Sequence, residues 1–166
     1  MRKNGIVKHI IIAAALLLGV SQSFAGGGGV RVPRRVQRQF DAMYPQAQQV
    51  DWSKNHGFEA DFRVQDKTAS LVFDRKGDVR YSKIDVNLNE LPVPVTNSLN
   101  GGFVGQGFQP EFATHRWSEK SGESYDVLVN KGREEYVLRY APNGNLITQF
   151  DVSKQDKQSE RIYFDD

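Results

Sequence analysis

Two neighbouring carboxylates are the first residues of this sequence whose spacing could support chemistry. Glu59 and Asp61 stand two positions apart in the run 58–64, in which apolar and polar residues alternate. In a β-strand this spacing places both side chains on one face, about 7 Å apart, and a pair of carboxyl groups can hydrolyse a glycoside by acid and base catalysis. Arg63 continues the same row, however, so the alternation alone predicts a solvated polar face. The solvated face is the preferred interpretation, and a small carboxylate-based hydrolase is kept as the third functional hypothesis.

Histidine and metal-binding patterns are sparse. His9 lies in the N-terminal segment 1–25, which is expected to be cleaved as described below; this leaves His56 and His115, and the sequence contains no cysteine. Neither a His-x-His pair nor a Gly-x-Ser-x-Gly turn occurs, so we expect no catalytic residue, no metal and no cofactor. The run 74–78 (DRKGD) holds two aspartates, but its basic residues and the missing closing glutamate do not suit calcium. A hairpin turn is the better interpretation of this run.

The two tryptophans are the strongest candidates for binding anchors. Trp52 and Trp117 each follow a proline by seven positions, and no other tryptophan occurs. Trp52 shares a strand face with Val50, so we expect it to pack in the core. Trp117 shares its face with His115, which leaves an exposed, partner-binding position open. The alternation of polar residues predicts a partner-binding patch on one sheet face, composed of Glu59, Asp61, Arg63, Tyr81, Lys83, Trp117 and Arg139.

The elements that position this patch begin with a helix. Val36, Phe40 and Met43 recur at spacings of four and three, which predicts an amphipathic helix over residues 33–43. Pro45 ends the helix, because the residue before a proline is pushed out of helical geometry. Alternating runs separated by turn residues then predict four strands, at residues 50–52, 58–64, 69–73 and 78–88. In the last of these, Tyr81 and Ile84 compete for burial on opposite faces.

The second half of the chain repeats this order. Val95, Leu99 and Phe103 keep helical spacing, although nearby glycines weaken that helix by about 1 kcal/mol each relative to alanine. Strands are predicted at residues 114–118, 124–129, 134–141 and 146–152. A helix must cover one face of a sheet to bury its apolar residues. The sequence therefore predicts an α+β fold with two tandem helix-plus-four-strand repeats, residues 33–90 and 91–153, that form an antiparallel sheet of about eight strands with both helices on one face.

The N-terminal segment of the chain indicates export. Residues 1–25 combine basic residues, a short apolar run and small residues before Ala25, which is typical of a cleaved signal peptide. The apolar run is shorter than the roughly 20 residues of a spanning helix, so we expect no stable membrane insertion and a periplasmic or secreted protein. Residues 26–32 form a flexible leader. Residues 154–166 form a polar tail, in which Ile162, Tyr163 and Phe164 could pack back as a short final strand.

Charge argues against nucleic acid as a partner. The signal peptide carries three of the 22 basic residues and none of the 20 acidic ones, which leaves 19 basic and 20 acidic residues and a net charge of −1. Nucleic-acid binding depends on a clustered basic face, which this balance does not suggest. A protein or peptide is the expected partner class.

Four short motifs in the first half carry a family resemblance. They are Tyr-Pro-x-Ala at 44–47, Val-Asp-Trp at 50–52, Phe-Glu-Ala-Asp-Phe at 58–62 and Phe-Asp-x-x-Gly-Asp at 73–78. Together they resemble the PepSY-like exported bacterial proteins, whose fold is like that of the β-lactamase inhibitor protein (BLIP). The resemblance covers most of residues 30–152 and implies tandem repeats with an open sheet that holds an enzyme or a peptide. The second half departs from the pattern at its glycine-rich helix and at Gln109, which replaces the tyrosine.

Three functional hypotheses follow from these observations. The first is a non-enzymatic exported binding module that engages an unidentified protein or peptide through the open sheet face, with inhibition of an enzyme as one form of that role. The alternative is a structural or envelope-assembly protein that self-associates through the sheet as a homodimer. The third is the hydrolase that would use Glu59 and Asp61.

Overall fold

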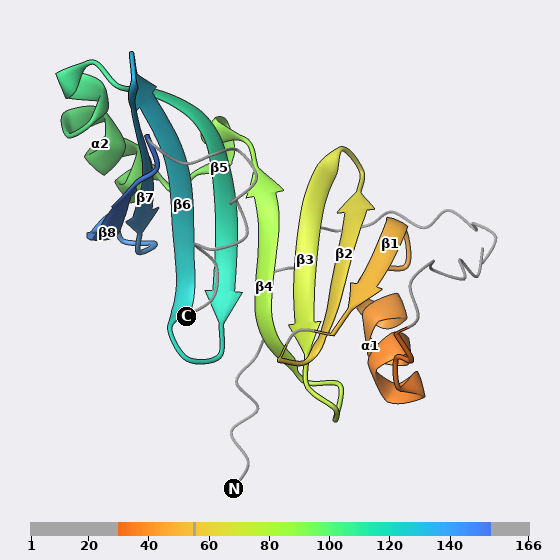
Figure 1. Cartoon of the computed structure of the whole chain (residues 1–166). Helices are drawn as coiled ribbons and strands as arrows, with labels where there is room; N and C mark the ends of the chain where they lie inside the picture. The colour runs from red at the N-terminus through yellow and green to blue at the C-terminus, as the bar shows by residue number, and fades with distance from the viewer. Residues whose placement is uncertain (1–29, 55, 154–166) are drawn as a thin grey trace, which may run out of the picture.

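The computed structural model of the chain describes residues 30–54 and 56–153 (Figure 1). The expected signal peptide (1–25), most of the leader (26–32), the tail (154–166) and its expected final strand lie outside the described residues. Within the described part of the chain, no helix is long and apolar enough to cross a membrane.

The chain forms a helix and four strands, and then a second helix and four strands (Figure 1). All eight strands belong to one sheet in the order β1 to β8, and each is antiparallel to its neighbours. The first group is α1 (Arg34–Met43), β1 (Gln48–Ser53), β2 (Phe58–Val64), β3 (Lys67–Phe73) and β4 (Val79–Val86). The second group is α2 (Val93–Gly101), β5 (Gln109–Ser118), β6 (Gly122–Lys131), β7 (Glu134–Tyr140) and β8 (Leu146–Asp151).

Helix α1 lies within one residue of its predicted range. Pro33 is the N-cap residue, and Val36 and Phe40 are buried on the apolar stripe. The helix ends at Met43, and the backbone N–H of its C-cap residue Tyr44 donates to the carbonyl of Phe40. Phe40 also meets Trp52 edge to face, with ring centroids 5.3 Å apart. The expectation that Trp52 packs against the core is confirmed.

Each helix covers its own half of the sheet with a separate apolar core. Val36 and Phe40 of α1 pack with residues of β2, β3 and β4, whereas Val95 and Leu99 of α2 pack with residues of β5, β6 and β7. Val86 of β4 contacts both cores and pairs with Ala113 of β5. Since paired residues project to the same side of a sheet, both helices lie on one face, as predicted.

The second helix and the strand after it differ from the prediction. Helix α2 ends at Gly101, and Phe103 lies beyond it. Strand β5 begins at Gln109 instead of residue 114, so Pro110 lies inside a strand, whereas Pro45 lies in the turn after α1. A register shift between Pro110 and Phe112 accommodates the proline, because proline cannot donate to the ladder and is tolerated at bulges. The two proline–tryptophan motifs therefore start in different local structures.

Candidate binding surface

The sheet face opposite the helices, called the open face here, holds six of the seven predicted binding residues. Glu59, Asp61 and Arg63 alternate along β2 with the core residues Phe58, Ala60 and Phe62. Tyr81 and Lys83 lie on the same side of β4, because their neighbours Ser82 and Ile84 are buried on the helix side. Arg139 of β7 alternates with Leu138, which belongs to the core under α2. The facing of β4 is thereby settled: Ile84 is in the core and Tyr81 is on the open face.

Trp117 does not share this surface, which corrects the predicted patch. It pairs with Ser82 of β4, two positions from the Ile84–His115 pair, and therefore lies on the helix side. Arg116, its neighbour in sequence, occupies the open face opposite Lys83. The register between β4 and β5 decides this outcome, because a shift by one residue exchanges the two faces of a strand.

Four side chains from four strands form a hydrogen-bonded cluster in the middle of the open face. Arg116 donates from Nη1 to Asp126 Oδ2 at 3.1 Å and from Nε to the hydroxyl of Tyr81 at 3.1 Å. Arg139 donates from Nε to Asp126 Oδ1 at 2.8 Å and from Nη2 to Oδ2 at 3.1 Å. Lys83 lies opposite Arg116 and acts electrostatically on Asp126. We therefore include it and call the five residues Tyr81, Lys83, Arg116, Asp126 and Arg139 the central polar cluster.

Burial sets the protonation behaviour of this cluster. Arg116 is 5% exposed and Asp126 is 4% exposed. Loss of solvation raises the pKa of Asp126 to about 6, and the neighbouring charges of Arg116 and Lys83 only partly oppose it. Burial also raises the pKa of the Tyr81 hydroxyl to about 12, although Arg116 acts in the opposite direction. Arg116 and Asp126 are thus fixed donor and acceptor groups with little access to water, whereas Tyr81, Lys83 and Arg139 remain partly exposed.

The alternation in the sequence did not identify Arg116 and Asp126 as members of the surface. Their types were visible, since Ser124, Asp126 and Leu128 form one side of a predicted strand. What links Asp126 to Arg139 is their direct pairing between β6 and β7. A buried carboxylate between two arginines is recognisable only once the strands are in register.

A second polar group surrounds Glu59 of β2, toward the β1 edge of the open face. Its carboxylate accepts hydrogen bonds from the hydroxyls of Ser53 at 3.2 Å and Ser70 at 3.1 Å. Asp61 and Arg63 are exposed, and Arg63 donates to the backbone carbonyl of Asp66 at 3.3 Å. Glu59 and Asp61 share one face, as predicted, but Glu59 is held by two serines.

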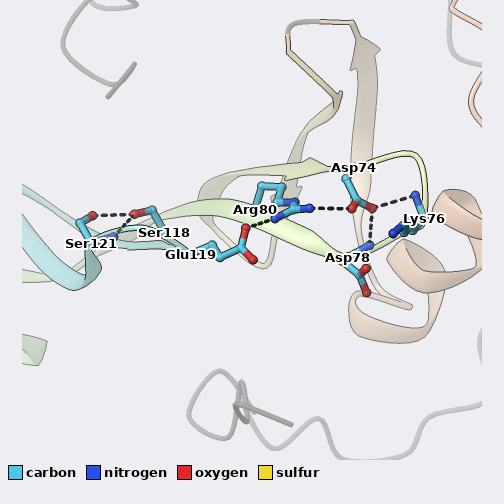
Figure 2. Close-up of polar contacts among 7 residues, drawn as sticks. All are labelled: Asp74, Lys76, Asp78, Arg80, Ser118, Glu119 and Ser121. Atoms are coloured by element: carbon cyan, nitrogen blue, oxygen red, sulfur yellow. Dashed lines mark hydrogen bonds and ion pairs between the residues drawn. The ribbon is translucent and has the colours of Figure 1, made fainter. Parts of the chain in front are cut away.

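The predicted hairpin turn after β3 is confirmed in atomic detail (Figure 2). Asp74 Oδ1 accepts from the backbone N–H groups of Lys76 at 2.7 Å and Asp78 at 3.0 Å, and Arg80 donates to Oδ2 at 2.9 Å. Loss of solvation acts to raise the pKa of Asp74, but these bonds and the charge of Arg80 together outweigh it and hold the pKa below its usual value. Arg80 also pairs with Glu119, so it links this hairpin to the turn between β5 and β6 (Figure 2).

The two histidines lie apart from the open face. His115 is on the helix side, where its ring lies 4.9 Å from that of Tyr125, and burial lowers its pKa. Its Nε2 atom is buried and has no hydrogen-bond partner among the residues that the structure describes. His56 is exposed in the turn between β1 and β2, with a positive φ of 51°. Among the described residues, no group of three or more His, Cys, Asp or Glu side chains is arranged to hold a metal ion.

Comparisons with solved structures define the class of fold. The chain is similar to a DUF2874 family protein from Bacteroides ovatus, with 27% identity and a TM-score of 0.64 over 78% of this chain and 94% of that one. It is also similar to a BLIP-like protein from Bacteroides fragilis, with 19% identity and a TM-score of 0.65 over 78% of this chain and 93% of that one. A candidate periplasmic protein from Bacteroides eggerthii shows 19% identity and a TM-score of 0.67 over 78% of this chain and 96% of that one.

These likenesses identify a BLIP-like fold, a single eight-stranded antiparallel sheet with two helices. A scan of the sequence against protein-family models finds no match, and a search among curated proteins finds none either.

Proposed function

We propose that the protein is an exported, non-enzymatic binding module that engages a protein or peptide through the open face of its sheet. The observation that carries the proposal is the central polar cluster. Side chains that already hold their binding geometry lose little conformational entropy when a partner arrives. Asp126 is itself buried, and its two hydrogen bonds with Arg139 fix in this way a guanidinium group that remains partly exposed.

The arrangement of charge favours recognition over proton transfer. Glu59 already accepts two hydroxyl groups, and Asp126 accepts two guanidinium groups. The face also has two ends of different charge, with Glu59 and Asp61 on β2 and the cations of the cluster on β4, β5 and β7. Such complementarity gives a protein–protein contact its specificity and its orientation.

We also propose that the protein is exported and that its fold consists of two tandem repeats. Residues 1–25 carry the sequence features of a cleaved signal peptide, and one structural neighbour is a candidate periplasmic protein. We interpret the two helix-plus-four-strand halves as tandem copies of one unit and the chain as a PepSY-like protein. Inhibition of an enzyme is the form of binding that the likeness to a BLIP-like protein favours.

The test is a triple charge reversal on the open face. In the mature protein, Asp61→Lys, Arg63→Glu and Lys83→Glu change side chains that the fold leaves at least partly accessible. Immobilised wild-type protein should retain a partner from a periplasmic extract, and this variant should lose it. The same partner captured in equal amount by the variant would show that the open face is not the binding surface.

A matched control separates the surface from the total charge. Arg34→Glu, Arg38→Glu and Asp41→Lys lie on exposed positions of α1, on the opposite side of the sheet. Both triple variants change the net charge by the same amount and in the same direction. The control variant should capture the partner as the wild type does.

Self-association is the alternative, and one feature of the sheet edge favours it. The edge strand β8 carries Leu146 and Ile147, which are 44% and 57% exposed. An edge strand has unpaired backbone N–H and C=O groups, so an edge strand with exposed apolar residues can pair with a strand of another chain. Sedimentation distinguishes the two hypotheses: a stable homodimer that Ile147→Lys converts to a monomer would favour the alternative, and a monomeric wild type would favour the binding module. A hydrolase would require an activity that Glu59→Gln abolishes.

A further inference from the structure

A row of apolar side chains crosses the open face over β5, β6 and β7. Phe112 pairs directly with Leu128, and Leu128 pairs with Val137. Each of the three stands next to a residue that is buried in the core under α2, so their own side chains project to the open face. A sheet with one covered face usually carries polar residues on the other. We call Phe112, Leu128 and Val137 the apolar row, and exposed apolar groups of this kind mark interaction sites.

A groove lies beside the apolar row, where β4 ends and β5 begins, at the upper edge of the sheet in Figure 1. Its volume is about 600 Å³, which is within the range of ligand pockets. The turn between β2 and β3, the end of β4 and the start of β5 contribute its walls. Phe112 belongs to the lining of the groove and is 45% exposed. The groove and the apolar row therefore form one continuous surface.

The groove carries an excess of negative charge. Asp66, Asp85 and Glu111 contribute carboxylates to it, and Lys67 is the one cation among its described lining residues. The Nζ atom of Lys67 lies 2.6 Å from Oε2 of Glu90, so that cation already has a carboxylate partner of its own. Asp66 and Glu111 are exposed. The groove therefore complements a positively charged group and disfavours a negatively charged one.

The backbone around the groove positions two of these carboxylates. A register shift between Pro110 and Phe112 leaves Glu111 as the extra residue of β5. Such a bulge directs a side chain away from the regular alternation of the strand, and Glu111 lines the groove. The carboxylate of Asp85 accepts the backbone N–H of Thr68 at 3.3 Å. The negative side of the groove is thus built into the ends of the strands.

We propose that the open face takes a partner segment in which a large apolar side chain stands next to a lysine or an arginine. This inference rests on the proposed function and names the chemistry of the partner. The apolar side chain packs on the apolar row, which spans about 10 Å across three strands. The cation enters the groove, with its aliphatic stem along the ring of Phe112. A cation over an aromatic ring is attracted to it, so Phe112 contacts both parts of the segment.

The experiment selects random eight-residue peptides, displayed on phage, against the immobilised mature protein. The recovered peptides should be enriched, relative to the unselected library, in lysine or arginine beside leucine, isoleucine or phenylalanine. Enrichment of acidic peptides, or the absence of any shared pattern, would overturn the inference. Enrichment of basic residues without apolar neighbours would also overturn it.

Paired variants then test the groove with one recovered peptide by fluorescence anisotropy. Asp66→Asn combined with Glu111→Gln should weaken binding by roughly tenfold at low salt, and the effect should shrink as salt is added. The matched control, Asp41→Asn combined with Glu123→Gln, removes two exposed carboxylates on the helix side of the sheet. The control should bind as the wild type does. Equal weakening by both double variants would show that total charge, and not the groove, attracts the peptide.

A second pair of variants tests the apolar row. Phe112→Ala should weaken binding by roughly tenfold at low and at high salt. Leu146→Ala is the control, because Leu146 is 44% exposed but pairs with the core residue Tyr140 and so lies on the helix side. Unchanged affinity in Phe112→Ala would contradict the inference.

The peptide selection can fail separately from the proposed function. It involves no periplasmic extract, and its variants avoid Asp61, Arg63 and Lys83, which the capture experiment changes. A captured partner that depends on those three residues, together with a library that yields no basic and apolar peptide, would refute this inference and leave the proposed function standing.

Discussion

Arg139 donates two hydrogen bonds to Asp126 across neighbouring strands, from Nε to Oδ1 at 2.8 Å and from Nη2 to Oδ2 at 3.1 Å. The two residues pair directly between β6 and β7, and Arg116 binds the same carboxylate from β5. This one contact joins three strands of the open face. It also places an ionisable group where burial controls its charge.

The pH dependence of stability should report on Asp126. Its pKa is raised to about 6 in the folded protein, whereas an aspartate in the unfolded chain has a pKa near 3.9. Because the folded pKa is the higher one, protonation of Asp126 stabilises the folded state. This contribution to the free energy of unfolding is complete below about pH 4 and is lost as the pH rises through about 6.

The measurement is urea unfolding of the wild type and of Asp126→Asn between pH 4 and pH 8. The wild type should gain stability relative to the variant as the pH falls through this window, by up to about 3 kcal/mol. The amide that replaces the carboxyl group in the variant cannot take up a proton, so the substitution removes the transition. Parallel stability curves for the two proteins would contradict the prediction.

Loss of a buried guanidinium should cost far more than loss of an exposed one. Arg116→Ala leaves Asp126 with one cation fewer in a buried site, which typically destabilises a protein by about 3–5 kcal/mol. Arg80→Ala removes an arginine whose side chain is 47% exposed and whose partners Asp74 and Glu119 are 18% and 59% exposed, and such surface pairs contribute roughly 0–1 kcal/mol each. Chemical denaturation of both variants makes the comparison. If Arg116→Ala and Arg80→Ala lowered the free energy of unfolding by similar amounts, the central polar cluster would not be a major source of stability.

A methyl group at Gly144 should disturb the docking of α2. Gly144 has a φ of +86°, and a Cβ atom there would collide with the backbone carbonyl of Pro94 at the start of the helix. Gly132 has a φ of +64° with nothing near its Cβ position. Gly132→Ala should therefore cost only the left-handed backbone penalty of about 1–2 kcal/mol. Gly144→Ala should show a clearly larger fall in melting temperature.

Truncation of Phe40 should loosen the first half of the protein. The ring is 2% exposed and contacts the rings of Trp52 and Phe62 at 5.3 and 5.0 Å. Phe40→Ala should destabilise the fold by about 3–5 kcal/mol and change the fluorescence of Trp52. Val93→Ala, at an exposed position of α2, is the control and should leave the stability nearly unchanged.

Local patterns predicted the elements well wherever one face of a helix or strand is apolar. The spacing of Val36 and Phe40 located α1 within one residue. The prediction was weaker around β5, which begins five residues earlier than expected. Pro110 interrupts the alternation there, and its pairing with Val129 depends on a bulge that is a property of two strands together.

The sequence by itself determined which residues of a single strand share a face, because side chains alternate with a period of two. Glu59, Asp61 and Arg63 were placed together on that basis, and the structure has them together. Only the tertiary structure decided which residues of one strand lie on the same side of the sheet as a given set of residues in the next strand. It put Arg116 on the open face and Trp117 on the helix side, and it brought Asp126 against Arg139. Register is set by the packing of the two cores and by the turns that join distant strands, and these are contacts that no single stretch of sequence contains.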